Sequence, residues 1–304
     1  MFYDEGGGGA SQGSPAAGLL FALSTKQLPK LTQVKGVGQK RFVGDAHGFA
    51  TGNDKIRKLR QTWSKLTDAG DKFDFRTQNR KCAIVVCEQD VREADELFQG
   101  TEVQICTGHI DLGARVGSGK REATELKVTE YIAQLAVYER LAASEPQVPH
   151  KLLLHTMLPR WNYWQRVTPD VGPLFQPVEE ALHRVLGTIL GIVVSPARRA
   201  LASLPSRKGG FGLANPVSTA TTNYETALDS TKVLRESIVL GTDVDQKQHI
   251  SHMVAARKRA EKKKEQTDAA TISEALPNIT ITEQLGFIMA YNEGLTMHLF
   301  NEQS

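Results

Sequence analysis

Apolar residues recur at three- and four-residue spacing in several stretches of the chain, a pattern typical of amphipathic helices. The first such stripe lies between the possible cap Asn53 and Gly70, and consists of Ile56, Leu59, Trp63 and Leu66. Two more stripes follow Gly119: first Val128, Tyr131, Ile132, Leu135 and Tyr138, then Leu174, Val178, Leu182, Val185 and Ile189. These patterns predict helices whose apolar faces pack into a core.

The amino-terminal third also contains short β-prone runs. Residues 39–51 read as two strand-like pieces about Gly44 and Asp45, and glycine tolerates the positive φ of a hairpin turn. We therefore expect a β-hairpin with its tip at these two residues. A capping serine and a proline predict a helix from Ser14 to Leu23. Further strands are expected at 82–87 and 102–106, with a short helix at 90–98 between them, so the first 117 residues are predicted to be α+β.

The rest of the chain is predicted to be a mostly helical bundle. The prolines between Pro146 and Pro177 should divide it into helices of ordinary length, since a proline has no N–H for the helical ladder. Beyond a turn-forming stretch at 204–212, helices are expected at 224–239 and from Asp245 to about Ala275. The sequence thus predicts three regions, at 1–117, 118–215 and 216–304.

Composition narrows the class of protein. The 304 residues are 40% hydrophobic, with 37 lysines and arginines against 34 acidic residues, so the chain is globular and its net charge of +3 is mild. Any nucleic-acid-binding surface must therefore be local, as at the basic cluster 257–264. Three cysteines cannot form a disulfide framework, and with no recognisable signal peptide this favours an intracellular protein, cytoplasmic or nuclear. No window reaches about 18 uninterrupted apolar residues, so no membrane span is expected. The chain is expected to begin in the middle of a domain.

Three apparent sites are weighed and set aside. Residues 9–13 fit a Gly-x-Ser-x-Gly nucleophile elbow around Ser11, but such an elbow follows a strand of an already built sheet. The run 117–120 hints at a phosphate loop, yet its spacing is wrong, and a polar turn before a helix is the better interpretation. A zinc set of Cys82, Cys87, Cys106 and His109 is disfavoured, and buried unligated thiols are expected instead.

The strongest candidate for an aromatic and basic nucleic-acid-binding cluster consists of Arg160, Trp161, Tyr163, Trp164 and Arg166. Such residues can contact the nucleic-acid backbone and stack on bases. Helical spacing puts both tryptophans on one face, so we favour core aromatics with surface arginines. The cluster at 257–264 could bind phosphates or serve nuclear import, or could be a solvated helix face without a partner, and both interpretations stay open.

The residues Gln12-Gly13-Ser14-Pro15 before an apolar helix, followed by Phe42-Val43-Gly44-Asp45 on a hairpin, resemble the reverse transcriptases of retroelements. In that family a Gln-Gly-Asp-Pro loop opens a helix beneath the incoming nucleotide and template, and a Tyr-x-Asp-Asp hairpin presents catalytic carboxylates. Lys81 before a β-prone run continues the resemblance, and residues 155–164 and 204–212 are similar to the helical region after the palm in certain animal retrotransposon polyproteins.

The resemblance covers about residues 1–215 and implies a fold. Residues 1–117 would be a partial palm domain, a helix plus β-hairpin and short strands, and 118–215 would be a helical thumb-like region. Residues 216–304 lie outside the resemblance, and their pattern alone predicts a helical region with a basic segment. Implied nucleotide or template contacts are Gln12, Gly13 and Ser14, with Lys81 near the pyrophosphate leaving group. Asp45 is the implied catalytic metal ligand, magnesium the cofactor and an RNA/DNA template-primer the partner.

Polymerase phosphoryl transfer uses two divalent ions held by converging carboxylates. Here Gly44 stands for the first hairpin aspartate and Asp45 for the second, the lesser ligand, while the remaining aspartate is expected upstream of the chain. With one carboxylate of three, the ions would lack charge compensation. We therefore expect a reverse-transcriptase remnant, nominally an RNA-directed DNA polymerase, that is inactive as this chain alone. The alternative is a non-catalytic helical protein that binds nucleic acid or another protein.

Overall fold

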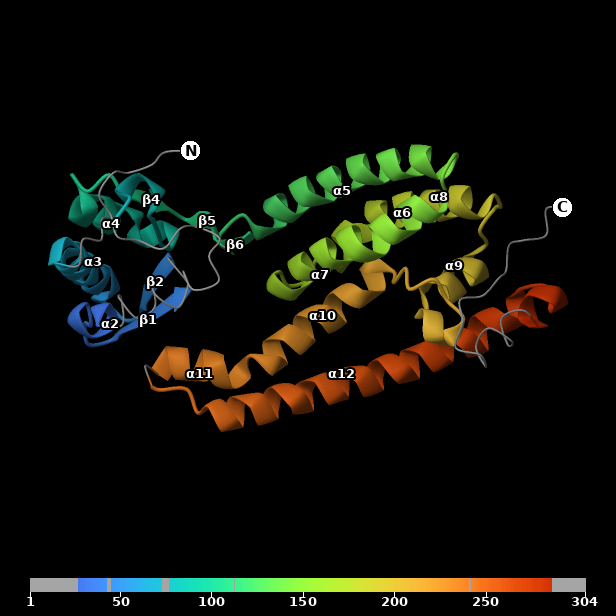
Figure 1. The fold of residues 1–304 in the computed structure, drawn as a ribbon. Helices are drawn as coiled ribbons and strands as arrows, with labels where there is room; N and C mark the ends of the chain where they lie inside the picture. Colours follow the sequence, from blue (N-terminus) through green and yellow to red (C-terminus); the bar gives the residue numbers. More distant parts are fainter. Residues whose placement is uncertain (1–26, 43–44, 73–76, 112, 241, 286–304) are drawn as a thin grey trace. The chain divides into compact units, whose positions relative to one another are not determined.

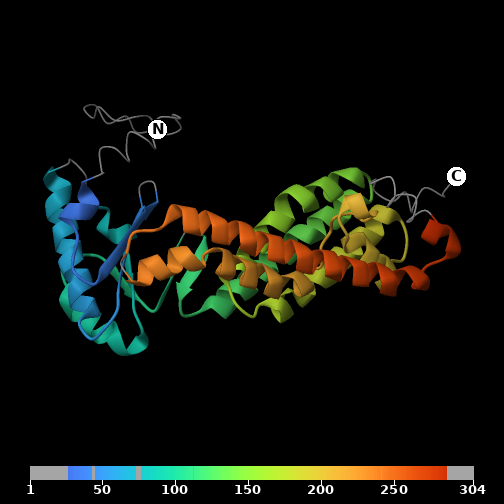
Figure 2. The same ribbon diagram turned by 90° about the horizontal axis from the view of Figure 1, so that it is seen from below.

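The computed structural model describes residues 27–42, 45–72, 77–111, 113–240 and 242–285, which are mostly helical with a few short strands (Figures 1 and 2). The chain divides into two compact units. The amino-terminal unit comprises the described residues of 1–109, 116–118 and 234–244, and the helical unit those of 110–115, 119–233 and 245–304. The predicted α+β composition is confirmed at this level. The predicted division into three regions stays a prediction.

The amino-terminal unit contains α2 (Leu28–Leu31), β1 (Val37–Phe42), β2 (Asp45–Ala50), α3 (Lys55–Lys72), β3 (Ala83–Val85), α4 (Val91–Phe98) and β4 (Gln104–Cys106). β1 and β2 form an antiparallel hairpin, and α3 packs against both strands. β3 and β4 are parallel neighbours, connected through α4. Ile56, Val86, Ala94 and Phe98 are the buried members of the core shared by α3, α4 and the segments beside them.

The predicted hairpin at 39–51 is confirmed, and the structure pairs Phe42 with Asp45. Its turn residues Val43 and Gly44 lie outside the described residues, as does the helix expected from Ser14 to Leu23. The helix expected to end before Gly70 continues to Lys72. The short strands and the helix between them are confirmed as β3, α4 and β4.

A second hairpin, not predicted from the sequence, precedes the helix that begins at Lys120. It pairs β5 (Gly108–Asp111) with β6 (Ala114–Gly117). Gly113 in its turn has a φ of 80°, which glycine adopts without strain. The described strands therefore form three separate two-stranded sheets.

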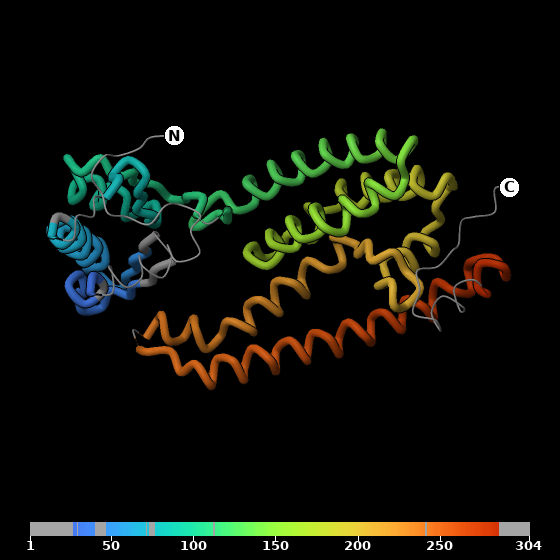
Figure 3. Tube along the Cα trace, in the orientation of Figure 1, coloured from blue at the N-terminus to red at the C-terminus, as the bar shows by residue number. Residues whose placement is uncertain are grey.

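The helical unit contains α5 (Lys120–Ala142), α6 (Gln147–Leu152), α7 (Leu158–Val167), α8 (Gln176–Leu190), α9 (Pro196–Ser203), α10 (Pro216–Ser230) and α12 (Gln246–Ala275); α11 (Lys232–Leu240) begins in this unit. α5 packs along α8, and α10 along α7. The tube trace shows α12 running back along α10 towards α9 (Figure 3). The Asp245 side chain caps α12 by accepting from the N–H of Gln248 at 3.0 Å, which confirms the predicted start of this helix.

Both apolar stripes predicted for this half face one core. Tyr131 and Leu135 of α5 are buried there, and so are Leu182 and Val185 of α8. The rings of Tyr131 and Trp161 meet edge to face, with centroids 6.4 Å apart. The prediction of a helical bundle built on these stripes is confirmed.

Two boundaries differ from expectation. The helical path continues from Gln147 to Val167 through Pro149 and Pro159, so these prolines do not separate helices. Pro159 falls in the first turn of α7, where proline is tolerated, and a π-helical turn at Leu153–Met157 precedes it. The single helix expected at 224–239 is divided instead, because the backbone of Thr231 leaves the helical conformation, with φ and ψ of −97° and 5°, and α10 ends at Ser230.

The turn-forming stretch 204–212 is a close-packed turn. Gly209 and Gly212 have φ values of 77° and 72°, and Gly210 has no room for a side chain. A Cβ on Gly210 would lie 2.1 Å from the carbonyl oxygen of Leu204 and 2.7 Å from that of Leu201. The glycines are therefore needed for the close approach of this turn to α9.

Replacing Gly210 by alanine should lower the free energy of unfolding by about 3 kcal/mol, because the backbone must move to relieve the steric clash. Gly191→Ala is the matched control: Gly191 has a φ of 65° but nothing within 4 Å, so it should cost only about 1 kcal/mol of backbone strain. Urea unfolding of both variants measures the difference. Equal losses of stability would contradict the packing explanation.

Candidate functional site

The hairpin of β1 and β2 places the backbone of Asp45 at its turn end. Asp45 is the first residue of β2 and pairs with Phe42, the last residue of β1. α3 packs against the hairpin, and Leu59 of that helix lies 3.7 Å from where a Cβ on Gly48 would stand. Gln12, Gly13 and Ser14 lie outside the described residues. Their predicted meeting with Asp45 stays a prediction.

Lys81 ends a single 3-10 turn, Asn79–Lys81, just before β3. Its side chain is exposed, and its backbone N–H donates to the carbonyl of Gln78 at 2.8 Å. β3 pairs with β4, and the hairpin of β1 and β2 is a separate sheet among the described strands. The predicted position of Lys81 before a strand is confirmed, but the structure assigns it no functional contact.

The basic segment, defined as residues 257–264, lies in the middle of α12. Two of its cations face α10. Arg259 donates to Asp229 at 2.6 Å, and Lys263 donates to Glu225 at 3.2 Å. The hydrogen bond from Arg259 holds the pKa of Asp229 below its ordinary value, with a smaller contribution from His252. Arg259 and Lys263 hold α12 against α10.

The other four cations of the basic segment are exposed, and no ion pair is found for them within the described part of the chain. We call them the free cations: Arg257, Lys258, Lys262 and Lys264. They share the α12 surface with one carboxylate of the segment, that of Glu261. Unlike the mild net charge, this cluster is a local concentration of positive charge of the kind that attracts phosphates.

Another cation near α12 is buried and has a structural role. Lys208 donates to Glu265 at 2.6 Å and to Asp268 at 2.8 Å, and both Lys208 and Asp268 are 8% exposed. Burial alone would lower the pKa of Lys208, but the hydrogen bonds to Asp268 and Glu265 outweigh it and raise the pKa above its usual value. Lys208 therefore ties the turn after α9 to α12.

Lys208→Met should destabilise the chain by about 3 kcal/mol, because it leaves Asp268 buried without its countercharge. Lys208→Met combined with Asp268→Asn should be clearly less destabilised. The control is Arg207→Met, whose exposed pair with the same Glu265 at 2.9 Å is worth less than about 1 kcal/mol. Urea unfolding decides: a double variant as unstable as Lys208→Met would contradict this explanation.

The aromatic cluster at 160–166 belongs to the core. Trp161 is fully buried and Trp164 is 5% exposed, while Tyr163 is 38% exposed. Arg160 lies over the Tyr131 ring at 5.4 Å and donates to Gln134 at 2.6 Å. The preferred interpretation, core tryptophans with a surface arginine, is confirmed.

The thiols differ from the expectation of burial. Cys87 is exposed, and Cys82 and Cys106 are half-buried. Cys82 and Cys87 lie just outside β3, next to the 3-10 turns Asn79–Lys81 and Glu88–Asp90, and not within the strand as predicted. Burial still raises the pKa of Cys82 above its ordinary value. Within the described residues, no group of three or more histidine, cysteine or acidic side chains is placed to hold a metal ion.

The run 117–120 is a turn before a helix, as predicted: Gly119 has a φ of 73° and α5 begins at Lys120. The nucleophile-elbow residues 9–13 lie outside the described residues. In the described part of the chain, no helix combines the length and the apolar character that crossing a membrane requires.

No family model, curated protein or solved structure matches the chain. Function is therefore inferred from the residues and their geometry.

Proposed function

We propose that the chain is a remnant of a retroelement reverse transcriptase, the carboxy-terminal part of a palm followed by a helical thumb-like region. The observation that carries the proposal is the hairpin of β1 and β2, because its turn joins Phe42 to Asp45 where the resemblance implies the hairpin with the catalytic carboxylates. We also propose that the protein is located in the cytoplasm or the nucleus.

The order of the elements supports the proposal. After the hairpin come α3, then Lys81 before β3, then α4, and finally a region that is helical from Lys120 onward. This is the order that the sequence resemblance implies for a palm followed by a thumb-like region. Because the three comparisons give no match, the hairpin and this order are its main support.

The donor set at the hairpin does not fit two magnesium ions. Gly44 stands where the resemblance implies an aspartate, so the hairpin offers only the carboxylate of Asp45. Two divalent ions about 4 Å apart need several oxygen ligands and their negative charge. We therefore derive no catalytic step here. RNA-directed DNA polymerisation is the nominal activity of the family, and the proposed role of this chain is to bind an RNA/DNA template-primer without extending it.

The purified chain should incorporate no nucleotides into a primer on an RNA template, with either magnesium or manganese, because the hairpin lacks most of the required carboxylates. Gel analysis of a labelled primer measures this. Template-dependent extension by the wild-type chain that is abolished in Asp45→Asn would show that another carboxylate completes the site, and would overturn the proposed loss of catalysis.

Binding of a labelled RNA/DNA template-primer should persist and should depend on the free cations. The variant R257Q/K258Q/K262Q/K264Q should bind more weakly. The slope of log affinity against log salt should become shallower by about 0.9 for each phosphate that the variant no longer neutralises. Fluorescence anisotropy over a salt series measures both quantities.

A matched control removes four exposed cations elsewhere, in K30Q/K35Q/R140Q/K151Q. Each variant replaces one arginine and three lysines, so their net charges are the same. Equal weakening in the two variants would show that net charge, and not the α12 surface, determines binding. Wild-type affinity in the α12 variant would contradict the proposed interface.

The alternative is a non-catalytic helical protein without this ancestry. Ile250 and Val254, one turn apart on α12, are 55% and 42% exposed, which favours contact with another protein. Competition between an RNA/DNA hybrid and single strands of equal length separates the two functions. A template-primer binder should prefer the hybrid, whereas equal or absent binding supports the alternative.

A further inference from the structure

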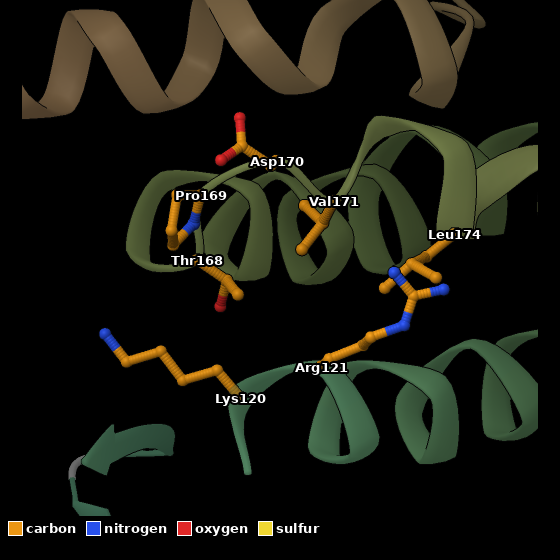
Figure 4. Close-up of a pocket in the computed structure, with 7 residues that line it drawn as sticks. All are labelled: Lys120, Arg121, Thr168, Pro169, Asp170, Val171 and Leu174. Carbon is orange, nitrogen blue, oxygen red and sulfur yellow. The ribbon is translucent and has the colours of Figure 1, made fainter. Parts of the chain in front are cut away.

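A cavity of about 210 Å³ lies at the start of α5, within the helical unit (Figure 4). Lys120 and Arg121 of the first helical turn line one side of it. The segment after α7 lines the other side, including Thr168 and Asp170, and Val171 and Leu174 add an apolar wall. The cavity is several times larger than the roughly 30 Å³ that one water molecule occupies in the liquid.

The first turn of α5 has unused hydrogen-bond donors. Its cap is Gly119, which has no side chain to accept from them. The first N–H of this turn with an acceptor among the described residues is that of Ala123, which donates to Gly119 at 3.1 Å. The N–H groups of Lys120, Arg121 and Glu122 are therefore available, and the helix dipole adds partial positive charge there.

A second observation, independent of the helix end, is the side chain of Thr168. This residue is only 3% exposed, and within the described residues its hydroxyl has no hydrogen-bond partner. Its backbone N–H closes α7 by donating to Trp164 at 3.0 Å, which fixes the residue in place. Figure 4 shows the hydroxyl directed towards α5. The hydroxyl is not among the side-chain atoms that are fully buried without a partner, so it keeps a small accessible surface from which it can donate to a ligand atom or a water molecule in the cavity.

The charges around the cavity favour an anion. Lys120 has no ion-pair partner in the described part of the chain, and Arg121 is held by Glu125 at 3.1 Å on the exposed face of α5. Asp170 is the one carboxylate of the lining, and Figure 4 shows its oxygens directed away from α5. A ligand oxygen beside Lys120 would thus meet donors and positive charge. The apolar wall leaves space for an organic group attached to it.

We propose that the amino terminus of α5, Lys120 and Thr168 form a binding site for a phosphate group. The unused N–H groups, the ammonium and the hydroxyl are all donors, which matches a phosphate with its several acceptor oxygens. The ligand is either a phosphate monoester or a phosphodiester of a nucleic acid, since both present the same oxygens. The site does not depend on the proposed descent from a reverse transcriptase.

The test uses the full chain with two probes, inorganic phosphate and a dinucleotide with an internal phosphodiester but no terminal phosphate. Calorimetry gives the affinities, and the amide NMR signals of residues 120–122 report the location. Thr168→Val removes the hydroxyl at nearly constant volume and should weaken binding about tenfold. Lys120→Gln should also weaken binding, and should reduce its salt dependence.

Two variants serve as matched controls on the same helix. Thr129→Val removes a hydroxyl that already bonds the carbonyl of Glu125 at 3.0 Å, and Lys127→Gln removes a cation already paired with Glu130 at 2.7 Å. Both should bind like the wild type. Lys120→Gln keeps the test decisive if Thr168→Val fails to fold.

Saturable binding of either probe that shifts these amides and is weakened by the site variants supports the proposal. The better-bound probe then identifies the source of the phosphate. Absence of saturable binding of both probes at millimolar concentration, or affinities that the site variants leave unchanged, would overturn it and would leave water as the occupant of the cavity.

Discussion

The helical unit buries the charged guanidinium of Arg199, and its packing must supply partners for that charge. A charge removed from water is tolerated only when an opposite charge and hydrogen-bond acceptors surround it. Glu179 of α8 accepts from Arg199 of α9 at 2.7 Å, and the carbonyl of Leu213 accepts at 2.8 Å. The buried amide of Gln165 also needs hydrogen-bond partners. It donates to the carbonyl of Pro216 and accepts from Asn223. Apolar stripes bring these helices together, whereas the polar groups select one arrangement of them.

The same requirement separates the cations of α12 into two kinds. Where a neighbouring element supplies a carboxylate, as Asp229 does for Arg259, the cation holds helices together and is not available to a ligand. Where none does, as at Lys262, the charge stays in solvent at little cost. The positive surface of α12 is therefore smaller than its number of basic residues indicates. Its position on the helix is determined by α10, whose carboxylates pair with the remaining cations.

The sequence predicted the elements better than their partners. The period of apolar residues located α3, α5 and α8, because this signal is local. The start of α12 was also expected at Asp245, and the structure adds that this side chain caps the helix. The parallel pairing of β3 with β4 depends on contacts between segments far apart in the sequence, on which periodicity carries no information. The hairpin at 108–117 is local, but its strands are only four residues long, too short for a clear alternating pattern. The exposure of Cys87 was not predicted either. For the candidate site, the hairpin and the position of Lys81 were predictable. The pairing of Lys263 and the unpartnered hydroxyl of Thr168 were not, since each depends on another helix.

The fold of a hairpin and its chemistry are under different constraints. β1 and β2 are paired through backbone N–H and carbonyl groups, to which the side chains at the turn contribute little. Glycine is moreover a favoured residue in hairpin turns, so an aspartate replaced by Gly44 would remove a metal ligand without disfavouring the hairpin. Affinity for nucleic acid resides elsewhere under our proposal, on exposed cations that need no hairpin carboxylate. Under the same proposal, loss of the ligand would neither unfold such a chain nor prevent it from binding nucleic acid, so the two properties could change independently in sequence.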